Sequence, residues 1–213
     1  MKLKLYSYYR SSAAYRVRIA LNLKGLAYQL AAVNLLGAEH RGDAYLALNP
    51  QGLVPALDLG DGRVITQSPA ILEWLDSSHP QPPLLPDEPY RRARVRSLCS
   101  TIACDIHPLN NLRVLEYLES TLNVDKEART VWYHHWIDTG FSSLELQVGE
   151  TDFCAGDQPG MADVYLVPQI FNALRLRVDM APYPRLYDIY RRCQHLEAFA
   201  RAHPDEQPDR PPA

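Results

Sequence analysis

The chain has 213 residues, of which 46% are hydrophobic and 22% charged, and its formal net charge is −3 at pH 7. This is the composition of a globular protein with one large domain or two small ones. The weak negative charge gives no argument for binding nucleic acid or an anionic membrane, and no apolar run approaches a membrane span. The N-terminus has the pattern of a short strand rather than of a signal sequence, so we expect a cytoplasmic protein.

The cysteines and histidines do not have the spacing of a metal site. The cysteines are scattered, without a C-x-x-C pair, at Cys99, Cys104, Cys154 and Cys193. We expect them to be reduced packing residues, with neither a zinc site nor a dithiol redox motif. His107, His134 and His135 form no familiar ligand set either, so we expect no metal.

The N-terminal part of the chain predicts a strand, a helix and a second strand. Residues 3–6 form the first strand, the helix begins near Ser11 or Ser12 and ends at Gly25, and residues 28–33 form the second strand. The helix is indicated by apolar residues that recur on one face, at Ala13, Val17, Ala20 and Leu21. A β-α-β unit this short has parallel strands and a right-handed crossover.

The junction between the first strand and the helix combines two hydroxyls and a cation, in Arg10, Ser11 and Ser12. The first turn of a helix offers unpaired backbone N–H groups and the positive end of the helix dipole, so an anion can bind there. Ligands of open α/β sheets usually bind at the carboxyl ends of strands, where this junction lies. The simpler interpretation is that one serine is only a helix cap.

The next elements complete a β-α-β-α-β-β-α pattern. Residues 37–48 contain a short helix, residues 53–59 and 64–66 form an antiparallel hairpin, and a further helix begins with Ser68 as its cap and Pro69 in its first turn. The Val54-Pro55 bond is a candidate cis peptide that leaves the Val54 backbone available to a ligand; a trans proline at a strand edge is the alternative.

A proline-dense stretch then separates this domain from one of different character. We expect a first domain over residues 1–80, a linker over 81–89, an all-helical domain over 90–202 and a disordered tail over 203–213. The helical domain has long helices over 90–118, interrupted near Pro108, and over 126–148, followed by one over 162–174 and a last one after residue 184. Trp132 and Trp136 are interpreted as core residues of the second of these helices.

This architecture, α/β followed by all-α, resembles the cytosolic glutathione transferases, and individual motifs resemble the zeta class. The matching stretches are Arg10-Ser11-Ser12 with residues 15–21, Gln67-Ser68, residues 104–113 around the helix break, and the C-terminal segments 167–169, 178–179 and 182–184. The resemblance covers nearly the whole chain. It implies a thioredoxin-like first domain, glutathione as cofactor and a homodimer.

The resemblance also implies an activity. Zeta-class enzymes use the glutathione thiolate to isomerise maleylacetoacetate in tyrosine and phenylalanine catabolism, and maleylpyruvate isomerases of gentisate catabolism are close siblings. The thiolate adds to the cis double bond, which permits rotation, and elimination restores the alkene in trans. The substrate is a maleyl-type dicarboxylate, for which arginines are suitable partners.

Site residues are assigned by position in the resembling motifs. The catalytic group is Arg10, Ser11 and Ser12, with Ser11 as the hydroxyl that stabilises the thiolate. The residues matched to glutathione binding are Ser11, His40, Val54, Gln67, Ser68, Asn110 and Asn111. Those matched to the substrate are Arg10, Arg175 and His107. Arg16 and Arg18, within the first helix, are expected to make structural ion pairs.

The sequence departs from the family pattern at two positions. Ala13 stands where animal and plant zeta enzymes have a cysteine, and Gly160 stands where the family has a serine or threonine helix cap. We expect neither change to remove activity. A generic transferase that conjugates electrophiles, and a binding protein without turnover, remain alternatives. The predicted thiolate site argues against the second, and Arg10 with Arg175 favours the isomerase over the first.

Overall fold

A computed structural model describes residues 2–211, which form two compact units. The first comprises residues 2–84 together with 194–211, and the second is Leu85–Cys193. The sequence assigned residues 194–202 to the helical domain, and the structure differs because helix α9 (Glu197–Ala200) packs against α1 (Ser12–Leu23). The side-chain amide of Asn22 donates to the carbonyl of Ala198 at 2.9 Å.

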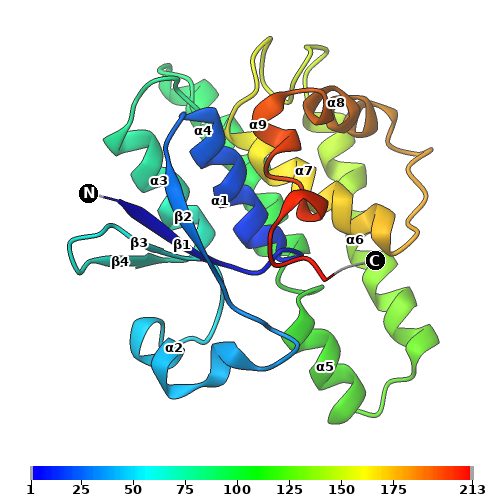
Figure 1. Cartoon of the computed structure of the whole chain (residues 1–213). Coiled ribbons are helices and arrows are strands. Elements are labelled where there is room, and N and C mark those ends of the chain that lie inside the picture. The colour runs from blue at the N-terminus through cyan, green and yellow to red at the C-terminus, as the bar shows by residue number, and fades with distance from the viewer. Residues whose placement is uncertain (1, 212–213) are drawn as a thin grey trace. The chain divides into compact units, whose positions relative to one another are not determined.

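The first unit is built on a mixed four-stranded sheet with the order β2-β1-β3-β4. The strands are β1 Leu3–Ser7, β2 Tyr28–Ala32, β3 Ala56–Asp58 and β4 Val64–Thr66. β1 and β2 are parallel, whereas β3 is antiparallel to both β1 and β4. Helices α1 and α3 (Ser68–Ser78) lie on one side of the sheet and α2 (Asp43–Leu48) on the other (Figure 1). The predicted β-α-β-α-β-β-α pattern is confirmed.

Helix α1 is buried on almost every side, which follows from its neighbours. The sheet covers one face, and α3 and α9 pack on others. Ser11 caps its first turn, and Gly25, at a φ of 63°, ends it in the left-handed conformation that suits glycine. Arg16 and Arg18 are therefore buried in the centre of this unit, at 1% and 0% exposure.

Helix α3 begins one residue earlier than the sequence suggested. Gln67, with φ 70° and ψ 117°, occupies the cap position, so Ser68 and Pro69 are the first two helical residues. The hairpin strand is also shorter than expected. β3 begins at Ala56 because Pro55 has no N–H with which to join the ladder. The Val54–Pro55 peptide is cis, and so is Gln81–Pro82.

The second unit consists of helices. They are α4 Pro89–Ser100, a π-helical turn η2 Thr101–Ile106, α5 Leu112–Ser120, α6 Lys126–Gln147, α7 Met161–Arg175 and most of α8 Pro184–Gln194. The predicted interruption near Pro108 is confirmed, since regular helix stops at Ile106 and resumes at Leu112. Helix α6 approaches the π-helical turn at Gly140, where a Cβ atom would lie 2.2 Å from Cδ1 of Ile106.

The tryptophans of α6 differ from their interpretation as core residues. Trp132 and Trp136 are only partly buried, whereas Tyr133, Ile137 and Phe141 form the buried face. Trp132 keeps its polar end satisfied by donating from Nε1 to the carbonyl of Leu109 at 2.9 Å. The buried stripe is thus displaced by about one residue along the helix from the tryptophan positions.

The tail does not have the disorder that its composition suggested, as far as residue 211; residues 212–213 lie outside the described residues. A 3-10 turn, η3, spans Pro204–Glu206. The buried side chain of Gln207 donates to the carbonyls of Arg201 at 3.0 Å and His203 at 2.9 Å. These bonds hold the turn, and Pro204 and Pro208, two of the prolines that suggested disorder, lie in turns.

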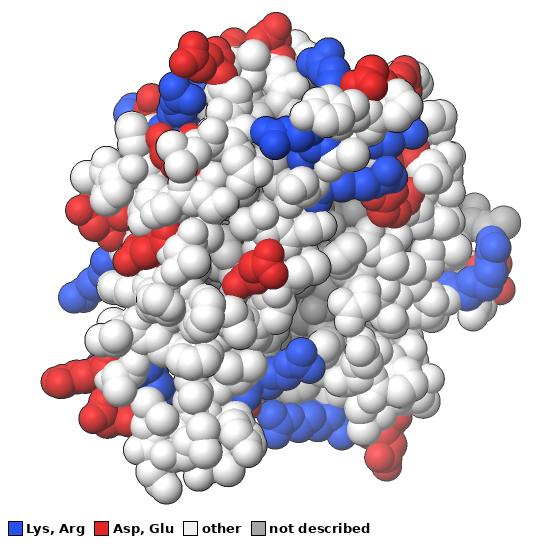
Figure 2. Space-filling model, turned by 180° about the vertical axis from the view of Figure 1, so that it is seen from behind, with Lys and Arg blue, Asp and Glu red and all other residues white. Residues whose placement is uncertain are grey.

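Charged groups of both signs are dispersed over the surface. On the face in Figure 2, basic and acidic side chains occur in small groups separated by uncharged surface. Within residues 2–211, no helix is both long and apolar enough to cross a membrane.

Candidate active site

Most of the predicted glutathione site lies at one edge of the sheet. Tyr6 of β1 pairs with Ala56 of β3, which pairs with Thr66 of β4. β1 and β4 end at this edge and β3 begins there. The edge therefore brings together the segments that follow or precede these strands: Arg10 and Ser11 after β1, Val54 before β3, and Gln67 and Ser68 after β4.

Ser11 holds the position that the sequence predicted for it. Its backbone is extended, and its Oγ accepts a hydrogen bond from the N–H of Ala14 at 3.2 Å. The carbonyl of Ser11 accepts from Tyr15, so α1 is fully engaged from its first turn. The hydroxyl hydrogen of Ser11 can still donate to an anion, and the dipole of α1 favours negative charge at the same place. Ser12, by contrast, is buried at 4% exposure.

A second helix N-terminus lies at the same edge. Ser68, at 3% exposure, accepts a hydrogen bond at 3.4 Å from Nη1 of Arg16. Arg16 thus contributes a bond to a hydroxyl of α3, and its expected ion pair stays a prediction. Gln67 donates from Nε2 to Oε1 of Gln51 at 2.6 Å, which ties it to the turn before Val54.

His40 lies against the same turn. It belongs to a short 3-10 segment, η1, Glu39–Arg41, that follows β2. Gly52 has a φ of 60°, and a Cβ atom there would lie 2.9 Å from the carbonyl oxygen of His40. Glycine is required for this approach. The predicted residues His40 and Val54 are consequently on two segments in contact.

Arg10 has aromatic neighbours. Its guanidinium lies 5.5 Å from the ring centroid of Tyr9, and the Tyr8 ring is 4.8 Å from that of Tyr9. Burial raises the pKa of the Tyr8 hydroxyl, and the charge of Arg10 opposes this rise. The loop of residues 8–11, here called the 8–11 loop, therefore carries a cation, Arg10, and a protonated phenol, Tyr8.

Arg18 is a structural residue of this edge, but its hydrogen-bond partners differ from the ion pair that the sequence predicted. It donates at 3.0 Å to Ser7 Oγ, to the carbonyl of Tyr9 and to the carbonyl of Ala202, instead of forming the expected ion pair. Burial lowers the pKa of Arg18 to about 10, which leaves it charged at neutral pH. The available signal was an arginine inside an otherwise apolar helix.

The remaining predicted residues form a separate group in the helical unit. Asn111 caps α5 and its Nδ2 lies 3.4 Å from Nε2 of His107, while Asn110 donates to the carbonyl of Tyr133 at 3.1 Å. Arg175 is the exposed last residue of α7. Burial raises the pKa of Tyr133 to about 12, against the opposing charge of Arg175. Tyr133 thus connects Asn110 with Arg175.

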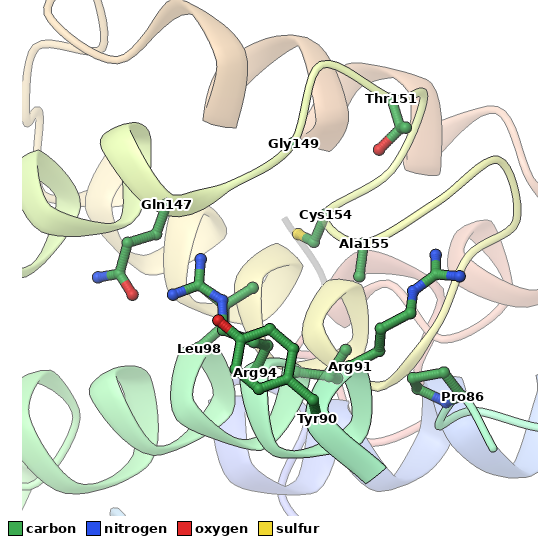
Figure 3. A pocket seen from close by; sticks show the side chains of 11 residues that line it. Pro86, Tyr90, Arg91, Arg94, Leu98, Gln147, Gly149, Thr151, Cys154 and Ala155 are labelled. Atoms are coloured by element: carbon green, nitrogen blue, oxygen red, sulfur yellow. The ribbon is translucent and has the colours of Figure 1, made fainter. Parts of the chain in front are cut away.

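The helical unit also has a pocket of about 300 Å³ that contains none of the predicted residues. Tyr90, Arg91 and Arg94 rise from α4 toward a loop that carries Thr151 and Cys154 (Figure 3). Burial and the nearby carboxylate of Asp163 raise the pKa of the Cys154 thiol, so it is not an activated nucleophile. Within the described residues, no group of three or more His, Cys, Asp or Glu could hold a metal ion.

The comparisons with known proteins agree with this architecture. Residues 10–78 match the family model "Glutathione S-transferase, N-terminal domain". The maleylacetoacetate isomerase of Pseudomonas aeruginosa is 49% identical over 213 residues, which cover 99% of this chain and 100% of the relative.

Two solved structures are similarly close. A bacterial maleylpyruvate isomerase, described as a glutathione S-transferase of the zeta class, has a TM-score of 0.94 and 49% identity, covering 97% of this chain and 99% of its own. The maleylacetoacetate isomerase of Anaeromyxobacter dehalogenans, with glutathione bound in its active site, has a TM-score of 0.89 and 45% identity, covering 99% and 98%.

The thioredoxin-like sheet, the helical second unit and the family match define a glutathione S-transferase. Within that class, the chain belongs to the zeta-class family of maleylacetoacetate and maleylpyruvate isomerases.

Proposed function

We propose that this chain is a glutathione-dependent cis–trans isomerase that converts maleylacetoacetate to fumarylacetoacetate. The observation that carries the proposal is Ser11 at the N-terminus of α1, with its Oγ bonded to the Ala14 N–H and its hydroxyl hydrogen able to donate. The identity to named maleylacetoacetate isomerases over the full chain supports the choice of substrate.

The residues at the sheet edge fit glutathione, which is an anionic tripeptide. Two helix N-termini, those of α1 and α3, meet there with Ser11 and the buried Ser68. Each offers backbone N–H donors and a positive dipole end, which suit a thiolate and a carboxylate. Ser68 and Gln67 would hold the γ-glutamyl group, the Val54 backbone the cysteinyl unit and His40 the glycyl end. Asn110 and Asn111 stay predicted contacts.

Glutathione supplies, when bound, the thiolate that adds reversibly to the cis double bond of the substrate. Ser11 stabilises that thiolate by donating its hydroxyl hydrogen, and the α1 dipole lowers the thiol pKa in the same direction. Ser12, buried behind Ser11, supports the first turn. Arg10 orients a substrate carboxylate, because a planar guanidinium binds carboxylates through two parallel hydrogen bonds. Arg175 and His107 are the further residues that we assign to the substrate.

The experiment measures isomerisation of maleylacetoacetate and maleylpyruvate by absorbance, with and without glutathione. We expect conversion only when glutathione is present in catalytic amount. The Ser11→Ala variant should lower kcat by about 100-fold, the usual effect of losing one donor to a developing anion. Arg175→Ala should instead raise the KM for the dicarboxylate.

The control is Asp125→Ala, which removes a helix cap of the same kind from α6, where the Asp125 carboxylate accepts from the Ala128 N–H at 2.8 Å. It should cost about 1 kcal/mol of stability without changing kcat. Wild-type kcat in Ser11→Ala would contradict the role of Ser11. Faster turnover of maleylpyruvate would make that the substrate, and conjugation of a chlorinated aromatic without isomerisation would favour a generic transferase.

We also infer that the protein is a cytoplasmic homodimer that acts in tyrosine and phenylalanine catabolism. An exposed face of α4, which carries Tyr90, Arg94 and Ser97, supports a protein partner, because Tyr90 is 71% exposed. Sedimentation velocity would find a single species of twice the chain mass of 24.2 kDa. A species of one chain mass would contradict the dimer.

A further inference from the structure

Residues 197–211, here called the C-terminal segment, contact the 8–11 loop, which carries Arg10 and Ser11. The N–H of Tyr9 donates to Oδ2 of Asp209 at 2.8 Å, across 200 positions of sequence. The carbonyl of the same residue accepts from Nη2 of Arg18 at 3.0 Å. Both polar groups of the Tyr9 backbone are therefore held by charged side chains, two residues before Ser11.

Arg18 connects this loop to the C-terminal segment a second time. Its Nε donates to the carbonyl of Ala202 at 3.0 Å, and its Nη1 donates to Ser7 Oγ at 3.0 Å. The charge of Asp209 opposes the fall in the pKa of Arg18 that burial causes, so the two charges attract each other. The guanidinium thus joins the end of β1, the 8–11 loop and residue 202.

The C-terminal segment is itself fixed, so it can act as a support. Gln207 ties residues 201 and 203 together, and Asn22 of α1 bonds to Ala198. The Arg210–Asp205 pair of the same segment, at 3.2 Å, has both side chains about half exposed, so it adds little to this support. A carboxylate on such a segment holds its partner in one position.

We propose that Asp209 is a positioning residue for catalysis, which fixes the Tyr9 peptide and through it the hydroxyl of Ser11, with Arg18 as its counterpart on the carbonyl side. This inference rests on the proposed role of Ser11. Residues 202–209 are then a required part of the glutathione-binding unit. Their contribution is to turnover rather than to the affinity for glutathione, because Val54, Gln67 and Ser68 lie on other segments.

The test compares Asp209→Ala with Asp209→Asn in the full chain. Alanine removes the acceptor of the Tyr9 N–H, and we expect kcat to fall about tenfold, since a misplacement of about 1 Å costs up to about 100-fold. The KM for glutathione should change less than about threefold. Asparagine keeps an acceptor oxygen and should retain kcat within about threefold of the wild type.

Asp205→Ala is the matched control, because Asp205 lies on the same segment and pairs with Arg210 without bonding to the 8–11 loop. It should leave kcat unchanged. Equal losses of kcat in Asp209→Ala and Asp209→Asn would assign the effect to the charge of Asp209 and would overturn the proposal. An equal loss of kcat in Asp205→Ala would assign the effect to general destabilisation and would also overturn it. Wild-type kcat in Asp209→Ala would overturn it too.

Measuring Ser11→Ala in parallel distinguishes the proposed role of Ser11 from the positioning role of Asp209. If Ser11→Ala keeps its activity, the proposed role of Ser11 is wrong. If Ser11→Ala loses activity and Asp209→Ala does not, only the positioning role of Asp209 is wrong. Should Asp209→Ala not fold, Asp209→Leu, which also lacks an acceptor for the Tyr9 N–H, replaces it, with amide hydrogen exchange at Tyr9 measured beside kcat. Faster exchange with a matching fall in kcat supports the role, and faster exchange with unchanged kcat overturns it.

Discussion

At the scale of single residues, Gln67 shows how the sheet edge departs from ordinary backbone geometry. Its φ of 70° and ψ of 117° lie outside the regions that residues with a Cβ atom usually adopt, and its side chain is exposed. Such a conformation costs about 1–3 kcal/mol and is found most often where function requires it. The position joins β4 to α3 and presents the Gln67 side chain beside Ser68.

We expect Gln67→Gly to be more stable and less functional than the wild type. Glycine adopts this conformation without strain, so the free energy of unfolding should rise by about 1 kcal/mol. The KM for glutathione should rise because the variant lacks the side chain that we propose to contact the γ-glutamyl group. Urea denaturation and steady-state kinetics measure the two effects.

Gln67→Ala is the control for that prediction. It removes the same side chain but keeps the strained Cβ, so it should raise the KM without gaining stability. A stability gain in the alanine variant equal to that in the glycine variant would show that the Gln67 backbone is not strained.

Residue by residue, the sequence predicted what depends on local patterns. Ser11 could be placed as a helix cap because a hydroxyl before an apolar periodic run has few other roles. The sequence could not predict that Arg18 and Asp209 bond to the same Tyr9 backbone. Hydrophobic periodicity carries no information on contacts between residues 191 positions apart. The functional roles of the named site residues stay predictions.

At the scale of elements, buried polar contacts fix how α1 and α3 meet the start of the linker. The side chain of Lys24, which follows α1, is fully buried. Its Nζ donates to Oδ1 of Asp76 at 2.6 Å, to the carbonyl of His79 at 2.7 Å and to the carbonyl of Pro82 at 2.8 Å. Asp76 also accepts from the N–H of Leu84 at 2.9 Å. The proline-dense stretch is thereby held against the two helices.

We expect Lys24→Met to destabilise the protein by about 3 kcal/mol, because it leaves a carboxylate that is only 15% exposed and two carbonyls without their donor. Arg63→Ala is the matched control. The pair Arg63–Asp61 has the same 2.6 Å separation, but its arginine side chain is 72% exposed. Removing it should cost much less stability than Lys24→Met does, because solvent screens an exposed pair. Similar losses in the two variants, measured by urea denaturation, would contradict this account.

Most elements could be predicted from periodicity and from proline and glycine, and the differences have physical reasons. The break before Pro108 follows from a missing donor and a steric clash, which sequence reveals directly. Large aromatic side chains usually pack in cores, so the sequence predicts a buried stripe through the tryptophans of α6, whereas Trp132 is only partly buried and donates its N–H to the carbonyl of Leu109. Tertiary contacts decided that case.

At the scale of the whole molecule, pH acts on the segment that supports the 8–11 loop. Burial lowers the pKa of His203 from 6.5, although the charges of Asp205 and Glu206 oppose the change and those of Arg18 and Arg210 reinforce it. The unfolded chain therefore binds this proton at a higher pH than the folded chain does. The contribution of neutral His203 to the free energy of unfolding is complete above pH 6.5 and is lost as the pH falls through the pKa of His203 in the folded chain.

We expect the free energy of unfolding to fall on acidification below about pH 6.5 with a smaller slope in His203→Asn than in the wild type, because asparagine does not titrate. Urea denaturation at several pH values between about 5 and 7 measures both slopes. Identical slopes would show that His203 does not contribute. At pH 7, where His203 is mostly neutral in both states, the difference in free energy of unfolding between His203→Asn and the wild type measures any loss of packing.

The return of the C-terminal segment to the first unit has a consequence for biosynthesis. A growing chain emerges N-terminus first, so residues 2–84 leave the ribosome before the partners of Arg18 and Tyr9 have been translated. Nε of Arg18 lacks its carbonyl acceptor until residue 202 is added, and the Tyr9 N–H lacks its carboxylate acceptor until residue 209 is added. In a nascent or prematurely terminated chain, the 8–11 loop is thus held by fewer hydrogen bonds than in the complete first unit.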